Sequence, residues 1–318
     1  MRSFRDFMEE RVRHYYTSGG PKIGPEGDFF TAPELDRSFG RAVAEFLLPF
    51  LREFERPTLL EIGAGRGLMA RDILEYIKER DRDLFGRTTY LICEISESLK
   101  RVQEKVLEGF PVLWTEELVP IEGVILSNEF FDTLPVHVVK EGRELHVGDS
   151  GEEVWIDIRD PRIKEFLRRM GYEDIDQRIE VCLDCIDFLR KIAESLIRGY
   201  HLLIDYGYTS EEITRFPEGT VLGYKKHKVR DDIYSGQMDL SAHVNFSALV
   251  EYGKDFGLET VFLQTQREFL TGIPGFLEEL QGLSFDGSPE AVERLSRMKT
   301  LLISMGDRFK VLFQRKGL

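Results

Sequence analysis

Apolar positions at helical spacing open the chain. Within residues 3–16 apolar side chains recur every three or four positions, which predicts an amphipathic helix that packs on the body of the protein. A segment rich in glycine and proline follows between residues 18 and 30. Thr31 and Glu34 then have the spacing of a capping box, in which each side chain caps the backbone amide of the other. We expect the helix that starts there to continue with one apolar face as far as Leu51.

From residue 58 onward short apolar runs alternate with helical patterns, which is typical of a parallel sheet covered by helices on both faces. Strands are predicted near residues 58–62, 89–93, 111–114, 123–128, 200–205, 258–263 and 309–315. Helices are predicted over residues 68–80, 96–108, 180–198 and 246–256. The last of them has Asn245 as a plausible N-cap and Gly257 as a left-handed terminator. The expected fold class is therefore α/β.

Two stretches interrupt this alternation. Residues 137–177 contain a polar, hairpin-like pattern and a short helix, and residues 207–241 are rich in glycine and in charges of both signs. We expect both stretches to be insertions that lie beside the sheet.

Composition and charge narrow the class of protein. The chain has 318 residues, of which 42% are hydrophobic and 31% charged, so it can bury the large core of a folded enzyme or scaffold. Its formal net charge of -14 repels phosphate backbones, and no basic run with interleaved aromatic residues offsets this. A nucleic-acid partner is therefore disfavoured. The same charge attracts a cationic small molecule or a basic protein segment.

No apolar run in the sequence resembles a signal peptide or is long enough to span a bilayer. We therefore expect no membrane insertion and a cytoplasmic location. Oligomeric state is not predicted.

The three cysteines are too few for a disulfide framework. Cys182 and Cys185 form a C-x-x-C pattern, but the second pair or the spaced histidine that a zinc site needs is missing, so no metal is expected. Both cysteines fall on one predicted helical stripe with Ile186 and Leu189. Because buried thiols behave as small hydrophobic groups, we expect them to pack in the core and not to perform redox or metal chemistry.

A glycine-rich turn joins the first predicted strand of the sheet to the following helix. Residues 59–62 run directly into Gly63, Ala64, Gly65, Arg66 and Gly67, and the helix begins at Leu68. Glycines let the chain turn sharply and let its backbone approach a ligand without an intervening side chain. By itself such a turn indicates only a nucleotide-like ligand.

Two details favour S-adenosylmethionine over a dinucleotide. The spacing is G-x-G-x-G, and a carboxylate, Glu61, stands just before the turn. That carboxylate repels a pyrophosphate but attracts the ammonium and sulfonium groups of S-adenosylmethionine. Glu94 ends the second strand, where it can accept both ribose hydroxyls, a role that NAD-binding folds share. The alternative, in which Glu61 and Glu94 are only solvated strand ends, is less favoured because both flank the loop.

Polar and aromatic residues follow the fourth strand. Asn128, Glu129 and Asp132 stand close to Phe130 and Phe131 at the carboxyl edge, where ligands of open α/β sheets bind. In many class I methyltransferases this position meets the nitrogen that is methylated, so the three polar residues are candidate catalytic groups. The alternative stays open that both phenylalanines belong to the core and that Asp132 caps a helix.

An ordered set of motifs covers nearly the whole chain. It comprises GDFFTAPEL at 27–35, EIGAGRG at 61–67, NEFFDTLP at 128–135, LIDYGY at 203–208, DLSAHVNF at 239–246 and MGDRFKVL at 305–312. Together these motifs resemble the MidA family, whose mitochondrial member is an arginine methyltransferase acting on a core subunit of respiratory complex I.

The resemblance implies a Rossmann-like, seven-stranded class I methyltransferase sheet. It implies an N-terminal helical cap over residues 1–56, whose loop around Asp28 closes over the cofactor. The S-adenosylmethionine-binding core then covers residues 57–318, and its insertions form a substrate lobe.

The function expected from these features is transfer of a methyl group from S-adenosylmethionine, in line, to a nitrogen nucleophile. The resemblance implies an arginine side chain of a partner protein as the acceptor, with a complex I subunit as one candidate. A cofactor-binding assembly factor with little or no turnover remains the alternative. A nicotinamide-dependent oxidoreductase ranks well below both because of Glu61 and the glycine spacing.

Overall fold

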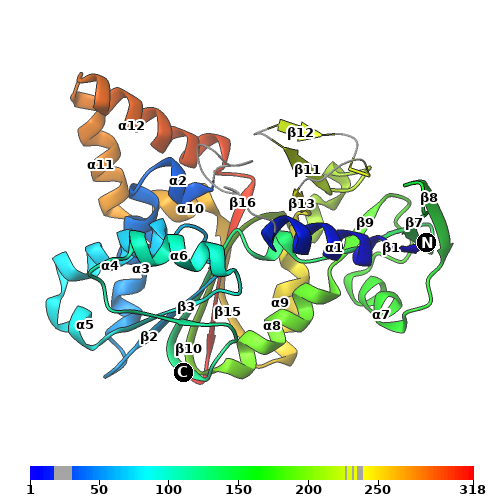
Figure 1. The fold of residues 1–318 in the computed structure, drawn as a ribbon, viewed down its shortest axis with the longest axis horizontal. Coiled ribbons are helices and arrows are strands. Elements are labelled where there is room, and N and C mark those ends of the chain that lie inside the picture. The colour runs from blue at the N-terminus through cyan, green and yellow to red at the C-terminus, as the bar shows by residue number, and fades with distance from the viewer. Residues whose placement is uncertain (18–30, 226–227, 231–232, 235–238) are drawn as a thin grey trace. The chain divides into compact units, whose positions relative to one another are not determined.

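The computed structural model describes residues 1–17, 31–225, 228–230, 233–234 and 239–318 (Figure 1). The chain forms two compact units. The lobe unit comprises Met1–Phe29, Phe130–Arg190 and Tyr206–Asp255, and the sheet unit comprises Phe30–Glu129, Lys191–Asp205 and Phe256–Leu318. Residues 137–177 and 207–241 belong to the lobe unit.

The sheet unit is built on seven strands, and each corresponds to a predicted one. They are ordered β15-β16-β10-β5-β2-β3-β4 across the sheet. Their bounds are β2 (Thr58–Ile62), β3 (Thr89–Cys93), β4 (Val112–Thr115), β5 (Ile121–Asn128), β10 (Leu196–Tyr208), β15 (Glu259–Thr265) and β16 (Phe309–Lys316). The sheet is of the seven-stranded α/β type that the sequence predicted, and its last strand, β16, pairs antiparallel with β15.

The central strand β2 pairs in parallel with β3 on one side and with β5 on the other. Ile62 stands opposite Cys93 of β3 and Ser127 of β5, so the carboxyl ends of the three strands meet at one edge. Leu60 and Ile125 are fully buried because helices cover both faces of a parallel sheet, which explains the nearly continuous apolar runs.

The helices of this unit include α4 (Leu68–Arg80) and α6 (Glu97–Val106), which confirm two predicted helices. α3 (Ser38–Leu51) packs along α4 (Figure 1). Further helices of the unit are α5 (Arg82–Arg87), α10 (Gln266–Thr271), α11 (Pro274–Phe285) and α12 (Pro289–Lys299).

The expected single helix from residue 31 to residue 51 is wrong, because two helices occupy this range. α2 (Ala32–Leu35) ends at Asp36, whose backbone is extended with φ -155° and ψ 140°, and α3 begins at Ser38. The buried carboxylate of Asp36 accepts the N–H of Ser38 at 3.0 Å and binds Arg294 at 3.0 Å. These bonds hold the break in place.

The predicted capping box is also wrong. Thr31 does occupy the N-cap position of α2, but its side chain makes no capping hydrogen bond. Glu34 turns instead to Arg66, 3.0 Å away.

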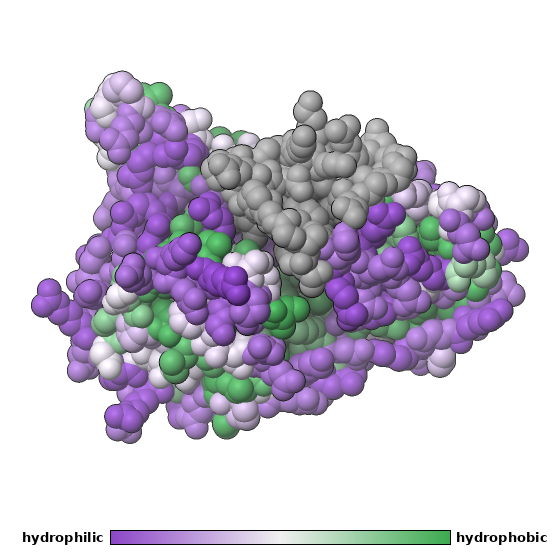
Figure 2. All heavy atoms as spheres, in the orientation of Figure 1, coloured by the Kyte–Doolittle hydropathy of each residue, from purple (hydrophilic) through white to green (hydrophobic). Residues whose placement is uncertain are grey.

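Polar faces of α11 and α12 lie at the surface. Glu278 is exposed, and Glu279 accepts a hydrogen bond from Arg294 at 2.5 Å. Figure 2 shows mostly hydrophilic residues over this helix pair. The acidic pair therefore includes one solvated and one ion-paired carboxylate.

The lobe unit contains a small antiparallel sheet. Its strands are ordered β1-β7-β6-β9, with β8 paired to β7, and their bounds are β1 (Arg2–Ser3), β6 (His137–Lys140), β7 (Arg143–Val147), β8 (Glu153–Asp157) and β9 (Ile179–Val181). Helix α1 (Phe4–Thr17) docks on this sheet through Phe4, Phe7 and Met8, which confirms the predicted first helix. The hairpin-like pattern is confirmed as β6 and β7, and the short helix as α7 (Pro161–Met170).

The rest of the lobe unit follows β10. A small sheet has the order β12-β11-β13, with β11 (Leu222–Lys225), β12 (Lys228–Arg230) and β13 (Asp239–Ser241). β14 (Val244–Asn245) pairs with the end of β10 and leads into α9 (Phe246–Asp255). Asn245 caps α9 by accepting the N–H of Ala248 at 3.0 Å, and Gly257 has φ 78°, as predicted.

The cysteine pair departs from expectation. Helix α8 spans Leu183–Ser195 and not 180–198, because residues 179–181 form β9 and β10 begins at Leu196. Cys182 thus precedes the helix instead of lying on its apolar stripe, and it forms a disulfide with Cys185. Cys185 itself is buried at 4% exposure, as expected.

None of the helices in the described part of the chain is long and apolar enough to cross a membrane.

Candidate functional site

The glycine-rich loop adopts the backbone that its sequence predicts. Gly63, Gly65 and Gly67 have φ values of 64°, 53° and 83°, in the left-handed region that favours glycine. The N–H of Gly67 donates to the carbonyl of Ala64 at 2.8 Å and closes the turn, and α4 follows at Leu68. The loop therefore presents backbone groups, with little side-chain bulk, at the edge where β2 ends.

Glu61 lies in the interior just before this loop. The residue is only 1% exposed, and its carboxylate accepts a hydrogen bond from the hydroxyl of Tyr90 at 2.7 Å. Burial raises the pKa of Glu61 to about 7, against the opposing effect of the Tyr90 bond. The alternative of a solvated strand end is wrong for Glu61.

Glu94 follows β3 and is held by two donors. One carboxylate oxygen accepts the N–H of Ser96 at 2.8 Å, and the other accepts the side-chain amide of Gln103 at 3.0 Å. The residue is only 9% exposed, and this burial raises the pKa of its carboxyl group. Glu94 is therefore a fixed acceptor and not a solvated strand end.

Gln103 is the residue that the sequence interpretation missed. Its amide nitrogen also donates to the carbonyl of Gly65 at 2.8 Å, and its oxygen accepts from the indole of Trp114 at 2.9 Å. It is fully buried on α6. The only available signal was a polar residue on the inward face of an otherwise amphipathic helix.

Asn128 and Glu129 stand at the end of β5. Since Ser127 pairs with Ile62, Asn128 lies beside Gly63 at the same sheet edge. The Asn128 amide donates to a carboxylate oxygen of Glu129 at 3.2 Å. Among the described residues its own buried Oδ1 finds no hydrogen-bond partner, which leaves an acceptor available to a ligand.

Glu129 adopts an unusual backbone conformation. Its φ is 49°, one of only two positive values among described residues other than glycine. Such backbone strain is concentrated at functional sites. Its Oε1 also accepts the N–H of Ala32 at 2.8 Å, which ties α2 to the end of β5.

Helix α2 is tied to the glycine-rich loop as well. Arg66 binds Glu34 at 3.0 Å, and the Glu34 side chain is only 5% exposed. Through Ala32 and Glu34, this short helix contacts both Glu129 and the loop. The sequence did not indicate this long-range ion pair, because Glu34 also has the spacing of a local capping box.

Asp132 belongs to the lobe unit, unlike the residues above. It lies in the short 3-10 helix Phe131–Thr133, where Phe130 is the N-cap, so the expectation that Asp132 caps a helix is wrong. Burial raises its pKa to about 6, and a hydrogen bond with Tyr206 opposes that rise. Phe131 is 1% exposed and is a core residue, as the alternative held, whereas Phe130 is only half-buried.

The sheet unit thus brings together most of the predicted site residues: Glu61, Gly63, Ala64, Gly65, Gly67, Glu94, Asn128 and Glu129. Asp132 lies in the other unit, and Asp28 lies outside the described residues. Within the described ranges, no group of three or more His, Cys, Asp or Glu side chains gathers as a metal site would require.

Comparison with protein families decides the class of enzyme. Residues 42–263, well over half of the chain, match the family described as "Putative S-adenosyl-L-methionine-dependent methyltransferase". The chain belongs to this methyltransferase family. The MidA resemblance is thereby confirmed, and the family description names S-adenosyl-L-methionine and not a nicotinamide as the cofactor.

Individual relatives of this methyltransferase cover nearly its full length. It is 26% identical over 356 residues to the Danio rerio protein arginine methyltransferase NDUFAF7, mitochondrial, covering 96% of this chain and 80% of the relative. It is 29% identical to the Mus musculus protein of the same name, covering 96% and 78%. A crystal structure of a Burkholderia thailandensis protein bound to S-adenosyl-homocysteine is 26% identical, with a TM-score of 0.82 over 99% of this chain and 88% of that one.

The methyltransferase's described residues fit the family cofactor. A cationic ligand suits the setting of Glu61 and Glu94, two carboxylates near the loop. The unused acceptor of Asn128 lies beside Gly63, at the position where a ligand on the loop would meet it.

Proposed function

We propose that this methyltransferase modifies an arginine side chain of a partner protein. The observation that carries the proposal is the position of Glu129, whose strained backbone follows β5 beside the glycine-rich loop. The names of the NDUFAF7 relatives support the same acceptor.

The cofactor supplies an activated methyl group on a sulfonium centre. We assign its binding to the loop residues Gly63, Ala64, Gly65 and Gly67. Glu94 accepts the ribose hydroxyls, and Glu61 supplies negative charge below the loop. Asp28 is proposed as part of the covering loop from the family resemblance alone.

Glu129 holds the acceptor guanidinium in this proposal. A guanidinium is planar and carries five donors, which carboxylates match in a fork arrangement. Glu129 would orient the attacked nitrogen and stabilise the positive charge that develops on the group. Asn128 supports Glu129 through the 3.2 Å hydrogen bond between their side chains.

Asp132 is the second proposed acceptor carboxylate. Its pKa of about 6 means that it is largely ionised at neutral pH, so it can attract a cation or take up a proton. The net charge of -14 favours the approach of a basic protein segment.

Labelled transfer tests this function. The purified protein is incubated with a cell lysate and isotopically labelled S-adenosylmethionine, and the proteins and metabolites are analysed by mass spectrometry. Label on arginine of a protein is the expected result, and a respiratory complex I subunit is one candidate acceptor. Label found only on lysine, on carboxylates or on small metabolites would overturn the arginine acceptor.

An assembly factor that binds the cofactor without turnover is the second candidate. It is favoured if calorimetry shows S-adenosylhomocysteine binding while no labelled methyl group reaches any cellular component. The cytoplasmic location also stays a prediction, which fractionation of cells followed by immunoblotting tests.

A further inference from the structure

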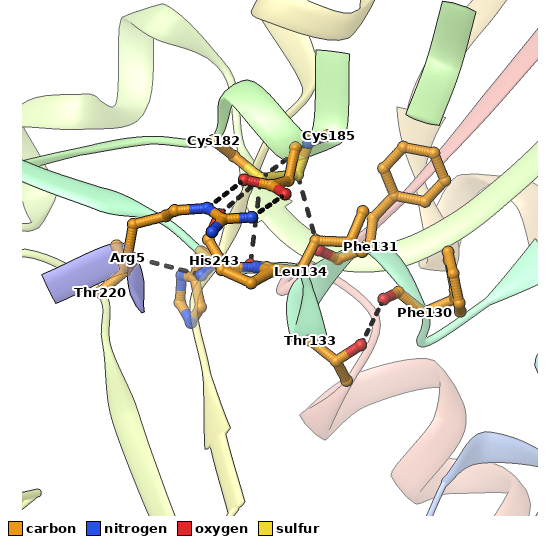
Figure 3. The surroundings of a disulfide bond; sticks show 11 residues. Arg5, Phe130, Phe131, Thr133, Leu134, Cys182, Cys185, Thr220 and His243 are labelled. Atoms are coloured by element: carbon orange, nitrogen blue, oxygen red, sulfur yellow. Dashed lines mark hydrogen bonds and ion pairs between the residues drawn. A yellow bond between two sulfur atoms is a disulfide. The ribbon is translucent and has the colours of Figure 1, made fainter. Parts of the chain in front are cut away.

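The disulfide of the lobe unit lies at the start of helix α8 (Figure 3). Cys182 stands immediately before the first helical residue, Leu183, and Cys185 lies within the first turn. The N–H of Cys185 points at the sulfur of Cys182, with the nitrogen 3.0 Å from Sγ. The proposed methyl-transfer reaction uses neither sulfur.

This disulfide is poorly suited to be a structural staple. The two cysteines are separated by 3 positions in sequence, and a disulfide stabilises a fold mainly by closing a long loop of the unfolded chain. A cross-link within one helical turn removes the least chain entropy. The disulfide therefore contributes little to the stability of the fold, and a role in thiol–disulfide exchange explains it better.

We propose that Cys182 and Cys185 form a reversible thiol–disulfide site that exchanges with low-molecular-weight thiols such as glutathione. Cys182 is the sulfur that the external thiolate attacks, and Cys185 is the leaving and resolving sulfur.

The roles of the two cysteines follow from the difference in their solvent exposure. Cys182 is partly exposed, whereas Cys185 is 4% exposed. An external thiolate can reach only the more exposed partner, since attack requires access to the sulfur along the S–S bond.

The helix start favours the reduced form of Cys182. The N–H of Cys185 and the positive end of the α8 dipole both stabilise negative charge on the Cys182 sulfur. The neighbouring Asp184 would oppose this, but Arg5 binds its carboxylate through two hydrogen bonds of 2.9 and 2.7 Å. The local negative charge of Asp184 is therefore balanced.

The surrounding backbone accommodates the dithiol as well as the disulfide. The sulfur of Cys182 lies 3.6 Å from the carbonyl oxygen of Pro135. The sulfur of Cys185 lies 3.6 Å from the carbonyl oxygen of Phe131 (Figure 3). A disulfide sulfur has no proton to donate, but each thiol of the reduced pair finds a carbonyl acceptor already in place. Both redox states can therefore exist in one fold.

The exchange is balanced in two steps. A glutathione thiolate attacks Sγ of Cys182, the S–S bond breaks, and its electron pair leaves with Cys185 as a thiolate that takes a proton from solvent. A second glutathione thiolate attacks the mixed disulfide, which releases Cys182 and forms glutathione disulfide. In total two electrons pass from two glutathione molecules to the pair, and the reverse sequence reoxidises it.

A redox titration of the full chain tests the proposal. The protein is equilibrated without oxygen in mixtures of reduced and oxidised glutathione, quenched with acid, and alkylated under denaturing conditions with a maleimide polymer that shifts it on a gel. We expect two thiols to appear together with a single midpoint within the range of the mixtures. The Cys93→Ala variant, which removes the remaining free cysteine, should show the same midpoint.

Two outcomes overturn the site. One is full alkylation of both thiols even in oxidised glutathione alone. The other is complete protection of both cysteines from alkylation in reduced glutathione alone, while the protein is folded. In either case Cys182 and Cys185 do not exchange with this couple.

Single variants test the assigned roles. With oxidised glutathione, Cys185→Ser should acquire one glutathione on Cys182 at least about ten-fold faster than Cys182→Ser acquires one on Cys185, because the second sulfur is buried. Thermal melting checks that both variants are folded. Equal rates in two folded variants would overturn the assignment of Cys182 as the attacked sulfur, and the wild-type titration stands independently of both.

Discussion

Gln103 donates one side-chain hydrogen bond to Glu94 at 3.0 Å and another from the same nitrogen to the carbonyl of Gly65 at 2.8 Å. A single buried amide thus connects the carboxylate after β3 to the glycine-rich loop after β2. It links two groups that the proposed function assigns to the binding of one cofactor. The loop and Glu94 are therefore expected to respond together when this link is broken.

Replacing Gln103 by Ala should weaken cofactor binding and destabilise the fold. The change leaves the Gly65 carbonyl, one oxygen of Glu94 and the Trp114 indole without their buried partner, and each lost partner costs about 1–3 kcal/mol. Urea unfolding should show the loss of stability, and calorimetry should show S-adenosylhomocysteine affinity reduced by about ten-fold or more.

Gln281→Ala is the matched control, because Gln281 is exposed on α11. It should change neither quantity. Unchanged ligand affinity in a folded Gln103→Ala protein would show that the link does not position the cofactor site.

Replacing Glu94 by Ala should reduce cofactor affinity directly. A hydrogen bond to a charged acceptor contributes on the order of 1.5 to 3 kcal/mol, so the dissociation constant of S-adenosylhomocysteine should rise by roughly ten- to a hundred-fold. Glu104→Ala, at an exposed position of helix α6, is the control and should bind normally. Tight NAD binding by the wild-type protein without any response to S-adenosylhomocysteine would contradict the cofactor assignment.

Much of the fold could be predicted because its signals are local. Buried parallel strands need apolar runs such as the one around Leu60, and the helix cap at Asn245 needs only its own side chain. The predictions failed where a distant partner decides the local structure. Asp36 breaks a helix through a bond to Arg294, and Glu34 leaves its capping position for Arg66.

The same distinction between local signals and distant partners applies to the candidate site. The glycines could be found because their spacing between one strand and the following helix is itself the signal. Glu94 could be found because it follows the next strand of the parallel sheet. Gln103 could not be found, since its importance depends on three partners brought together by tertiary packing. The cysteine pair was misjudged because helix α8 begins at Leu183, which moves Cys182 from a helical stripe to the helix start.

Glu61 should make the stability of the cofactor-free protein depend on pH. Burial raises its pKa from 4.5 to about 7, so between these values the folded state binds more protons than the unfolded state. Its stabilising contribution is complete below about pH 4.5 and is lost as the pH rises towards 7 and beyond.

The Glu61→Gln variant removes this dependence because an amide does not titrate in this range. Its side-chain oxygen can still accept the Tyr90 hydrogen bond. As the pH rises from about 5 to about 8, the free energy of unfolding of the variant should increase relative to that of wild type by up to roughly 3 kcal/mol. Urea unfolding of both proteins at the two pH values measures it. A difference between the proteins that does not change with pH would contradict the raised pKa.

Replacing Glu129 by Gln should separate cofactor binding from turnover. The carboxylate is proposed to act on the acceptor, and a glutamine keeps an oxygen that can accept the Ala32 N–H now bound at 2.8 Å. Cofactor affinity should therefore stay nearly unchanged, while loss of the charge that stabilises the guanidinium in the transition state should lower kcat by roughly a hundred-fold. The control is Glu122→Gln, an exposed glutamate on strand β5, which precedes Glu129, and this variant should keep full turnover. Calorimetry with S-adenosylhomocysteine and initial rates of labelled methyl transfer give the two quantities. Equal turnover in Glu129→Gln and wild type would remove Glu129 from the acceptor site, and a parallel loss of cofactor affinity would assign it to cofactor binding instead.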